Sequence, residues 1–106
     1  MKVLNTLRPG LDEKAYENAL LIELRKRGHH VEQQKQFDVI YEGQVVDTLI
    51  PDLIVDSLVI VDPKVTEGFT STHLSQMIGY LTITHLRLAL LLNFKHFDLS
   101  WKRVVR

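Results

Sequence analysis

Four consecutive apolar residues, Leu58 to Val61, come directly before Asp62, Pro63 and Lys64. Successive side chains of a strand point to opposite faces of a sheet, so this strand is apolar on both faces. Such a strand lies inside a sheet that other elements cover, as is usual in α/β proteins. We therefore expect an α/β fold in which this strand runs to about Lys64 within a mixed sheet flanked by helices.

Two segments have the apolar periodicity of a helix. From Leu11 to about Arg27 the apolar residues form one stripe, and Gly28 follows where a left-handed residue would end the helix. Acidic residues lie in its first turn and basic residues in its last, the order that the helix dipole favours. Residues 70–72, all Ser or Thr, can cap a second helix. Its apolar stripe consists of Leu74, Met77, Ile78 and Leu81.

Several shorter segments have the features of strands. Residues 37–41 alternate in character, the turn signal Glu42-Gly43 follows, and Val45 and Val46 come next. A second turn at Asp56-Ser57 separates residues 53–55 from the apolar strand. We expect three strands in a meander here, a buried strand at 86–92 and a short final strand at 104–105. The predicted order of elements is α-β-β-β-α-β.

Length and composition limit the functions that this chain can have. Its 106 residues predict one domain, 1–106, with a single core. The absence of cysteine excludes a disulfide framework and a thiolate zinc site. No apolar run approaches the roughly 20 residues that cross a bilayer, and the N-terminus does not resemble a secretory signal, so we expect a cytoplasmic protein.

The formal net charge of zero argues mildly against a tight nucleic-acid binder, because phosphate contacts need a basic surface. Acidic site residues can nevertheless offset a basic rim. The basic residues do cluster, at Arg25, Lys26 and Arg27 and again at Lys95, Lys102, Arg103 and Arg106. Trp101 lies within the second cluster, where it could stack on a base or pack at a subunit contact. We expect it to lie at the edge of the core.

Asp52 follows Pro51, ten residues before Asp62, and begins the strand that precedes the apolar one. Two carboxylates that meet there supply oxygen ligands for Mg²⁺, which binds few protein carboxylates and retains several waters. Lys64 projects from the same face as Asp62 and can orient or deprotonate an attacking water, or stabilise charge on a phosphate. The alternative is that these acids are ordinary turn and strand-end residues.

The register of the hairpin decides whether the two acids meet. A regular two-residue loop at Asp56-Ser57 would pair Asp52 with Val61 and place the acids on opposite faces of the sheet. A three-residue loop or a bulge would instead pair Asp52 with Asp62. The metal-site hypothesis therefore requires an irregular hairpin.

The run Gly10-Leu11-Asp12-Glu13-Lys14-Ala15-Tyr16 resembles the pattern that gives the GxxExxY protein family its name. That family belongs to the PD-(D/E)XK nuclease superfamily, so the resemblance implies a restriction-endonuclease-like core. The match extends over nearly the whole chain. It continues through residues 19–20, 23–24, 27–28 and 52–55, Gln76, residues 80–81 and 88–94, and Arg103-Val104-Val105-Arg106.

The resemblance also implies roles for individual residues. Asp52, Asp62 and Lys64 would be the signature residues, although family members usually carry glutamate where this chain has Asp62. A helix glutamate, Glu13 at the named position or Glu17 one turn further on, would complete the acidic site. Gln76 and Tyr80 resemble the QxxxY element of RecB-like nucleases, which helps to place the substrate. Tyr80 otherwise suits a partly buried core position.

The implied function is a nuclease that depends on Mg²⁺ or Mn²⁺ and hydrolyses DNA phosphodiester bonds in DNA repair or recombination. A homodimer would suit a two-strand substrate, because so small a domain covers few base pairs. The alternative is a catalytically inactive binding or assembly module that keeps the nuclease fold. The neutral charge and the sequence Asp62-Pro63-Lys64 favour this second interpretation.

Overall fold

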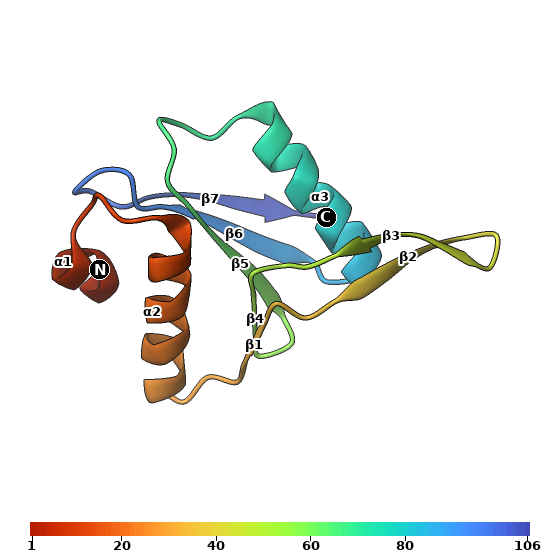
Figure 1. The fold of residues 1–106 in the computed structure, drawn as a ribbon, viewed down its shortest axis with the longest axis horizontal. Helices are drawn as coiled ribbons and strands as arrows, with labels where there is room; N and C mark the ends of the chain where they lie inside the picture. Colours follow the sequence, from red (N-terminus) through yellow and green to blue (C-terminus); the bar gives the residue numbers. More distant parts are fainter.

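The computed structural model describes residues 1–106. Its helices are α1 (Lys2–Leu7), α2 (Glu13–Lys26) and α3 (Ser71–Thr84). Its strands are β1 (Val31–Gln33), β2 (Phe37–Tyr41), β3 (Gln44–Leu49), β4 (Leu53–Val55), β5 (Val59–Lys64), β6 (Leu88–Asn93) and β7 (Ser100–Val105). A five-stranded sheet has the order β1-β4-β5-β6-β7, and β2 and β3 form a separate two-stranded sheet (Figure 1).

Strand β5 lies in the middle of the main sheet, as its apolar sequence predicts. It pairs antiparallel with β4 and parallel with β6, and α3 makes the crossover between these parallel strands. The outer strands β1 and β7 pair antiparallel with β4 and β6. The predicted α/β fold with a mixed sheet flanked by helices is confirmed.

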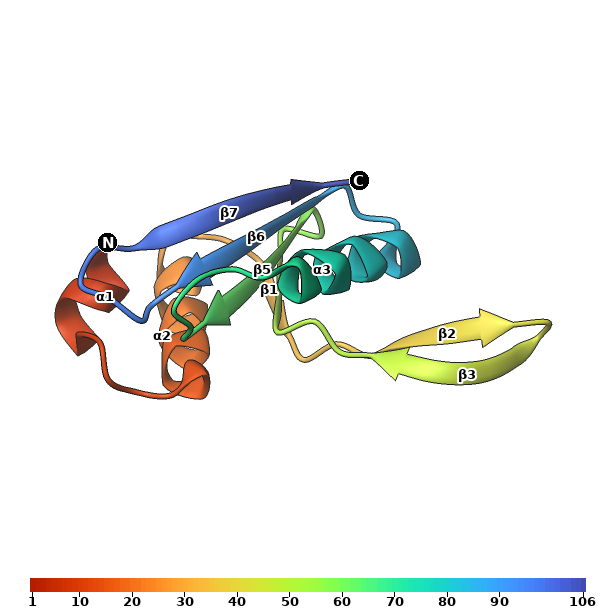
Figure 2. The same ribbon diagram turned by 90° about the horizontal axis from the view of Figure 1, so that it is seen from above.

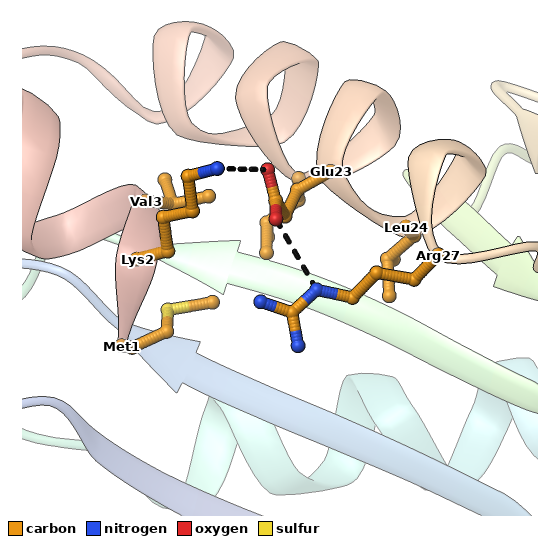
Figure 3. A pocket seen from close by; sticks show the side chains of 7 residues that line it. Met1, Lys2, Val3, Glu23, Leu24 and Arg27 are labelled. Atoms are coloured by element: carbon orange, nitrogen blue, oxygen red, sulfur yellow. Dashed lines mark hydrogen bonds and ion pairs between the residues drawn. The ribbon is translucent and has the colours of Figure 1, made fainter.

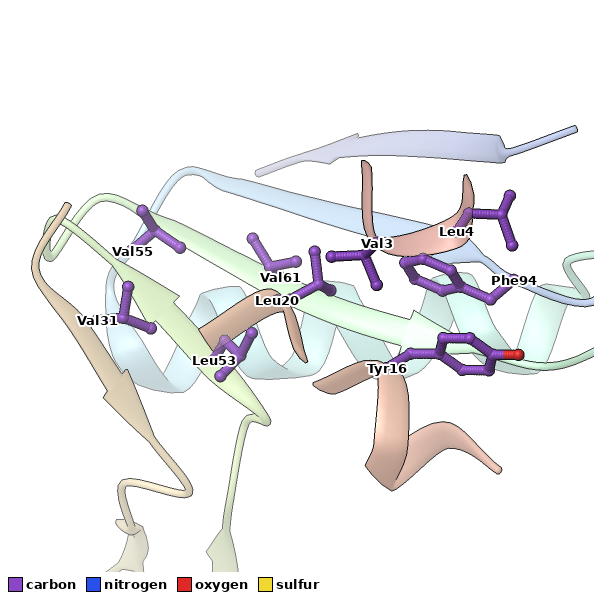
Figure 4. Packing of buried hydrophobic residues seen from close by; sticks show 9 residues of the cluster. All are labelled: Val3, Leu4, Tyr16, Leu20, Val31, Leu53, Val55, Val61 and Phe94. Atoms are coloured by element: carbon purple, nitrogen blue, oxygen red, sulfur yellow. The ribbon is translucent and has the colours of Figure 1, made fainter. Parts of the chain in front are cut away.

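Helix α2 covers one face of the sheet. Tyr16 and Leu20 of this helix are buried in a cluster with Leu53, Val61 and Phe94 (Figure 4). The rings of Tyr16 and Phe94 stack, with centroids 4.6 Å apart and planes 8° from parallel. Phe94 directly follows β6, and its N–H donates to the Lys64 carbonyl at 2.8 Å. The stack therefore holds α2 against the carboxyl ends of β5 and β6.

Helix α3 covers the opposite face. Met77 and Leu81 pack with Ile54, Ile60 and Leu91 in a second buried cluster. Because Ile60 and Val61 are successive residues of β5 and belong to different clusters, α2 and α3 lie on opposite faces of the sheet. No helix of the structure has the length and apolar character needed to cross a membrane.

The loop between α1 and α2 is fastened by the hydroxyl group of Tyr16. This group donates to the Arg8 carbonyl at 2.6 Å and accepts from the Leu11 N–H at 3.2 Å. Arg8 and Gly10 both have positive φ, 68° and 119°, and such a conformation is strained for arginine. The hydrogen bonds of Tyr16 thus stabilise a loop that includes an unfavourable backbone conformation.

A hollow of about 210 Å³ lies between α1 and α2 (Figure 3). On its rim, the Glu23 carboxylate lies 3.7 Å from Lys2 Nζ and 3.2 Å from Arg27 Nε. The hydrogen bond from Arg27 is the main reason why the pKa of Glu23 is lowered. The Lys2–Glu23 pair connects α1 to α2 across the hollow, whereas the Arg27–Glu23 pair lies at the C-terminal end of α2, and together they account for the polar rim.

Both predicted helices and the buried strand at 86–92 are present, with small shifts of their ends. The predicted order was incomplete, because α1 and β1 were missed and the last strand is longer than expected. The predicted meander was wrong at the step from β3 to the next strand, because β2 and β3 pair only with each other and not with β4. The polar residues 34–36 and Pro51 separate this hairpin from the main sheet, and the alternation of its side chains indicates a strand without indicating its partner.

We expect Tyr16→Phe to lower the free energy of unfolding by about 1–3 kcal/mol, because two hydrogen bonds of the loop are lost while the ring stack is kept. Urea denaturation would measure the change. Tyr41→Phe is the matched control: Tyr41 is 66% exposed, and its loss of a hydroxyl group should change stability by less than about 0.5 kcal/mol. Equal effects of the two substitutions would contradict the role given to the Tyr16 hydroxyl.

Candidate active site

The turn between β4 and β5 has three residues. Val55 pairs with Val59, which leaves Asp56, Ser57 and Leu58 in the loop, and Leu53 pairs with Val61. Continuing this register by one residue places Asp52 opposite Asp62. The irregular hairpin that the metal-site hypothesis requires is therefore present.

Asp56 fastens this turn to the segment before β1. Its carboxylate accepts a hydrogen bond from the His30 N–H at 2.9 Å and lies 2.7 Å from His29 Nδ1. The hydrogen bond to His29 is the main cause of a lowered pKa of Asp56. Asp56 and Ser57 both have φ of 55°, a left-handed conformation that lets the chain reverse over three residues. The two histidines thus help to hold the register.

Asp62 and Lys64 lie on the α3 face of β5, because they alternate with Val61 and Pro63. Asp62 is only 5% exposed, and Lys64 Nζ lies 3.4 Å from Asp62 Oδ2. The structure therefore brings together an acid and a lysine that are close to the surface but largely removed from water.

Burial is the main cause that raises the pKa of Asp62 to about 8, and the neighbouring Asp52 contributes to this rise through a hydrogen bond and its negative charge. Lys64 opposes this shift because its positive charge stabilises the ionised form. Two carboxyl groups that share one position resist ionising together. A cation bound beside them would stabilise both carboxylates in their ionised form.

Glu17, rather than Glu13, is connected to Asp52. Glu17 is 4% exposed, and its Oε2 accepts hydrogen bonds from Lys14 Nζ at 3.2 Å, Gln33 Nε2 at 2.6 Å and Gln34 Nε2 at 3.0 Å. The same Gln34 Nε2 donates to Asp52 Oδ1 at 3.1 Å. One side-chain amide, which has two N–H donors, therefore joins the helix carboxylate to the site.

Glu13 is exposed and takes a different position. Its Oε2 accepts a hydrogen bond from the Val65 N–H at 3.1 Å, one residue beyond Lys64. This contact fastens the start of α2 to the end of β5. Both helix glutamates thus lie near the ends of the site strands, and only Glu17 has a side-chain connection to one of the paired acids.

Gln76 and Tyr80 lie on α3, above the same face of the sheet. Gln76 Nε2 lies 3.4 Å from the Tyr80 hydroxyl oxygen. The pKa of Tyr80 is raised by partial burial first and then by the negative charges of Asp62 and Asp52. Tyr80 is therefore close enough to interact electrostatically with both acids, whereas Gln76 is exposed and contacts Tyr80.

Gln34 is a site residue that the sequence did not indicate. It follows β1 in a left-handed conformation, with φ of 58°, and its N–H donates to the Asp52 carbonyl at 3.0 Å. Its neighbours Glu32, Gln33 and Lys35 are also polar, so the segment resembles an ordinary loop in sequence. Strained residues of this kind are concentrated at functional sites.

The donor set fits a magnesium ion better than a zinc ion. Asp52 and Asp62 offer carboxylate oxygens, and Mg²⁺ is commonly held by one or two carboxylates with waters in its remaining positions. The structure contains no group of three or more His, Asp or Glu residues arranged to hold a metal ion. The two acids would therefore have to hold an ion with water or substrate oxygens.

The fold and these paired acids define an α/β protein with a candidate two-carboxylate site at the end of its central strands. A family model described as the PD-(D/E)XK nuclease superfamily matches residues 1–104. The chain belongs to the PD-(D/E)XK nuclease superfamily, and its fold is consistent with the restriction-endonuclease-like core. Comparison with curated proteins and with solved structures found no match.

The raised pKa of Asp62 predicts a pH-dependent stability in the absence of divalent metal. Below about pH 4 the carboxyl is neutral in the folded and unfolded chains and has no effect. From pH 4 to 8 the unfolded chain releases this proton while the folded chain keeps it, so the free energy of unfolding falls as the pH rises. We expect Asp62→Asn to be more stable than wild type at pH 8 by on the order of 2 kcal/mol, and by less at pH 5.

Urea denaturation in EDTA at several pH values would measure this difference, and Asp98→Asn, at an exposed aspartate outside the site, is the matched control. A stability difference that does not grow with pH would mean that Asp62 is already ionised in the folded protein at pH 5.

Proposed function

We propose that this protein is a metal-dependent nuclease that hydrolyses DNA phosphodiester bonds. The observation that supports it most is the pairing of Asp52 and Asp62 beside Lys64, in a chain of a nuclease superfamily.

In this proposal Asp52 and Asp62 hold Mg²⁺ or Mn²⁺. Such an ion, when bound, lowers the pKa of water and neutralises phosphate charge. Lys64, 3.4 Å from Asp62, orients or deprotonates the attacking water or stabilises charge on the phosphate. Glu17 keeps Asp52 in position through Gln34, while Glu13 supports the end of β5. Gln76 and Tyr80 position the substrate from α3.

Within the superfamily, the motif of Gly10, Glu13 and Tyr16 supports membership of the GxxExxY family. Residues 1–106 would then form one nuclease-like domain that acts in DNA repair or recombination. The buried ring of Tyr16 and its bonds to the α1–α2 loop explain the motif tyrosine as a structural residue.

The second candidate is a binding or assembly module that keeps the nuclease fold without its activity. Two observations favour it: only two acids converge on the site, and Lys64 already pairs with one of them. Manganese affinity separates the candidates. A degenerate site would bind Mn²⁺ weakly or not at all, whereas a nuclease site would bind it in the concentration range that supports cleavage.

We expect the purified protein to cleave DNA only when Mg²⁺ or Mn²⁺ is present. Linear, single-stranded and branched DNAs should be compared, and Asp62→Ala should reduce cleavage to the level of wild type in EDTA. Lys64→Ala should lower the rate by about 10²–10⁴-fold, the usual contribution of a proton-transfer group. Asp98→Ala should retain activity. Cleavage that survives in Asp62→Ala would point to a contaminant or another site, and no cleavage of any DNA would favour the binding module.

Gln34→Ala should weaken Mn²⁺ binding and lower activity by about 10–100-fold, because groups that orient metal ligands have effects of this size. Calorimetric titration with Mn²⁺ would measure the affinity. Gln36→Ala is the matched control, since Gln36 is exposed two residues further along the same loop. If the two variants bound Mn²⁺ with equal affinity, Gln34 would have no role in orienting the metal ligands.

A further inference from the structure

The β2–β3 hairpin extends away from the body of the protein (Figures 1 and 2). Its outer half is apolar and uncovered: Ile40, Tyr41, Val45 and Val46 are between 56% and 66% exposed. An isolated two-stranded hairpin is at best marginally stable in water. Successive residues such as Ile40 and Tyr41 point to opposite faces of a strand, so apolar side chains are uncovered on both faces of the hairpin. The hairpin therefore has the character of a docking element.

The charge of the hairpin excludes nucleic acid as its partner. Asp38, Glu42 and Asp47 lie on it, and no lysine, arginine or histidine occurs anywhere from Gln36 to Pro63. Phosphate groups would be repelled by this surface. The hairpin requires a partner that offers both apolar and basic side chains.

Strand β7 of the same chain offers such a surface. It is the edge strand of the main sheet and pairs only with β6, so its outer backbone groups are free for another strand. Trp101 and Val105 are 61% and 62% exposed, which places Trp101 in solvent and not at the core edge as expected. Lys102, Arg103 and Arg106 are exposed beside them.

Charge complementarity favours one way of pairing the hairpin and β7 between two copies of this chain. If two β7 strands met at their edges, Lys102 and Arg103 would face like charges, and if two hairpins met, their acids would do so. A hairpin on β7 instead brings acidic side chains to basic ones and covers apolar residues on both elements. We propose that the hairpin of one copy docks on β7 of a second copy.

The docking can be reciprocal, since each chain carries both elements. In both views β7 runs toward the side of the molecule from which the hairpin extends (Figures 1 and 2). A two-fold axis would then make the same contact twice and close the assembly as a dimer. This inference does not depend on the proposed nuclease activity, and its test measures association alone.

Sedimentation equilibrium of the full chain would test whether it forms this dimer. Concentrations from about 1 to 100 µM suit a dimer of moderate affinity. We expect wild type to form dimers. The hairpin variant Asp38→Lys/Asp47→Lys and the strand variant Lys102→Glu/Arg103→Glu should each raise the dimer Kd about tenfold or more, because both contacts become repulsive. Lys26→Glu, at an exposed position of α2 away from both elements, should leave the Kd unchanged, and thermal unfolding would confirm that each variant folds.

Mixing the two charge variants is the decisive measurement. Each contact of a mixed dimer joins opposite charges again, so the mixture should associate more tightly than either variant does alone. The same recovery should occur in a chain that carries all four substitutions. A monomeric wild type, a dimer insensitive to both variants, or a mixture that fails to associate would overturn the proposal. A monomer whose DNA affinity falls in the strand variant would assign β7 to nucleic acid instead.

Discussion

The candidate site depends on how the chain turns between β4 and β5. Three residues in this loop, with Asp56 bound to His29 and His30, set the register that puts Asp52 opposite Asp62. A loop one residue shorter would turn one of these acids to the opposite face of the sheet, and the chain would keep its α/β fold without a paired-acid site. The backbone geometry of a turn that contains neither of these two acids thus determines whether their carboxylates can act together.

The site is held by contacts from elements that are distant in sequence. Gln34 joins Asp52 to Glu17 of α2, while Glu13 and Phe94 bind the backbone at and just after the end of β5. These contacts hold in place an arrangement that is unfavourable for charge, because Asp62 is buried beside a second carboxyl group and its ionisation is disfavoured. Functional sites commonly contain such local strain, which the remaining structure must offset.

Sequence patterns predicted the elements whose periodicity reflects burial. The β5 strand, both main helices and the alternation that puts Asp62 and Lys64 on one face follow from the order of apolar residues. Gln34 could not be predicted, because its role depends on a left-handed turn and on neighbours from two other elements. Glu13 and Glu17 could not be distinguished either, since they lie one helical turn apart and only the folded structure shows that Glu17 is buried and bonded to Gln34.

The hairpin is inserted between two residues that are hydrogen-bonded to each other, since the Gln34 N–H donates to the Asp52 carbonyl at 3.0 Å. This bond closes the base of the segment that contains the hairpin, so the length of that segment does not alter the position of the acids. Loop insertions closed in this way cost little free energy as they lengthen. Evolution could therefore exchange the hairpin for another module, and so change the partners of the protein, while its acids stay in place.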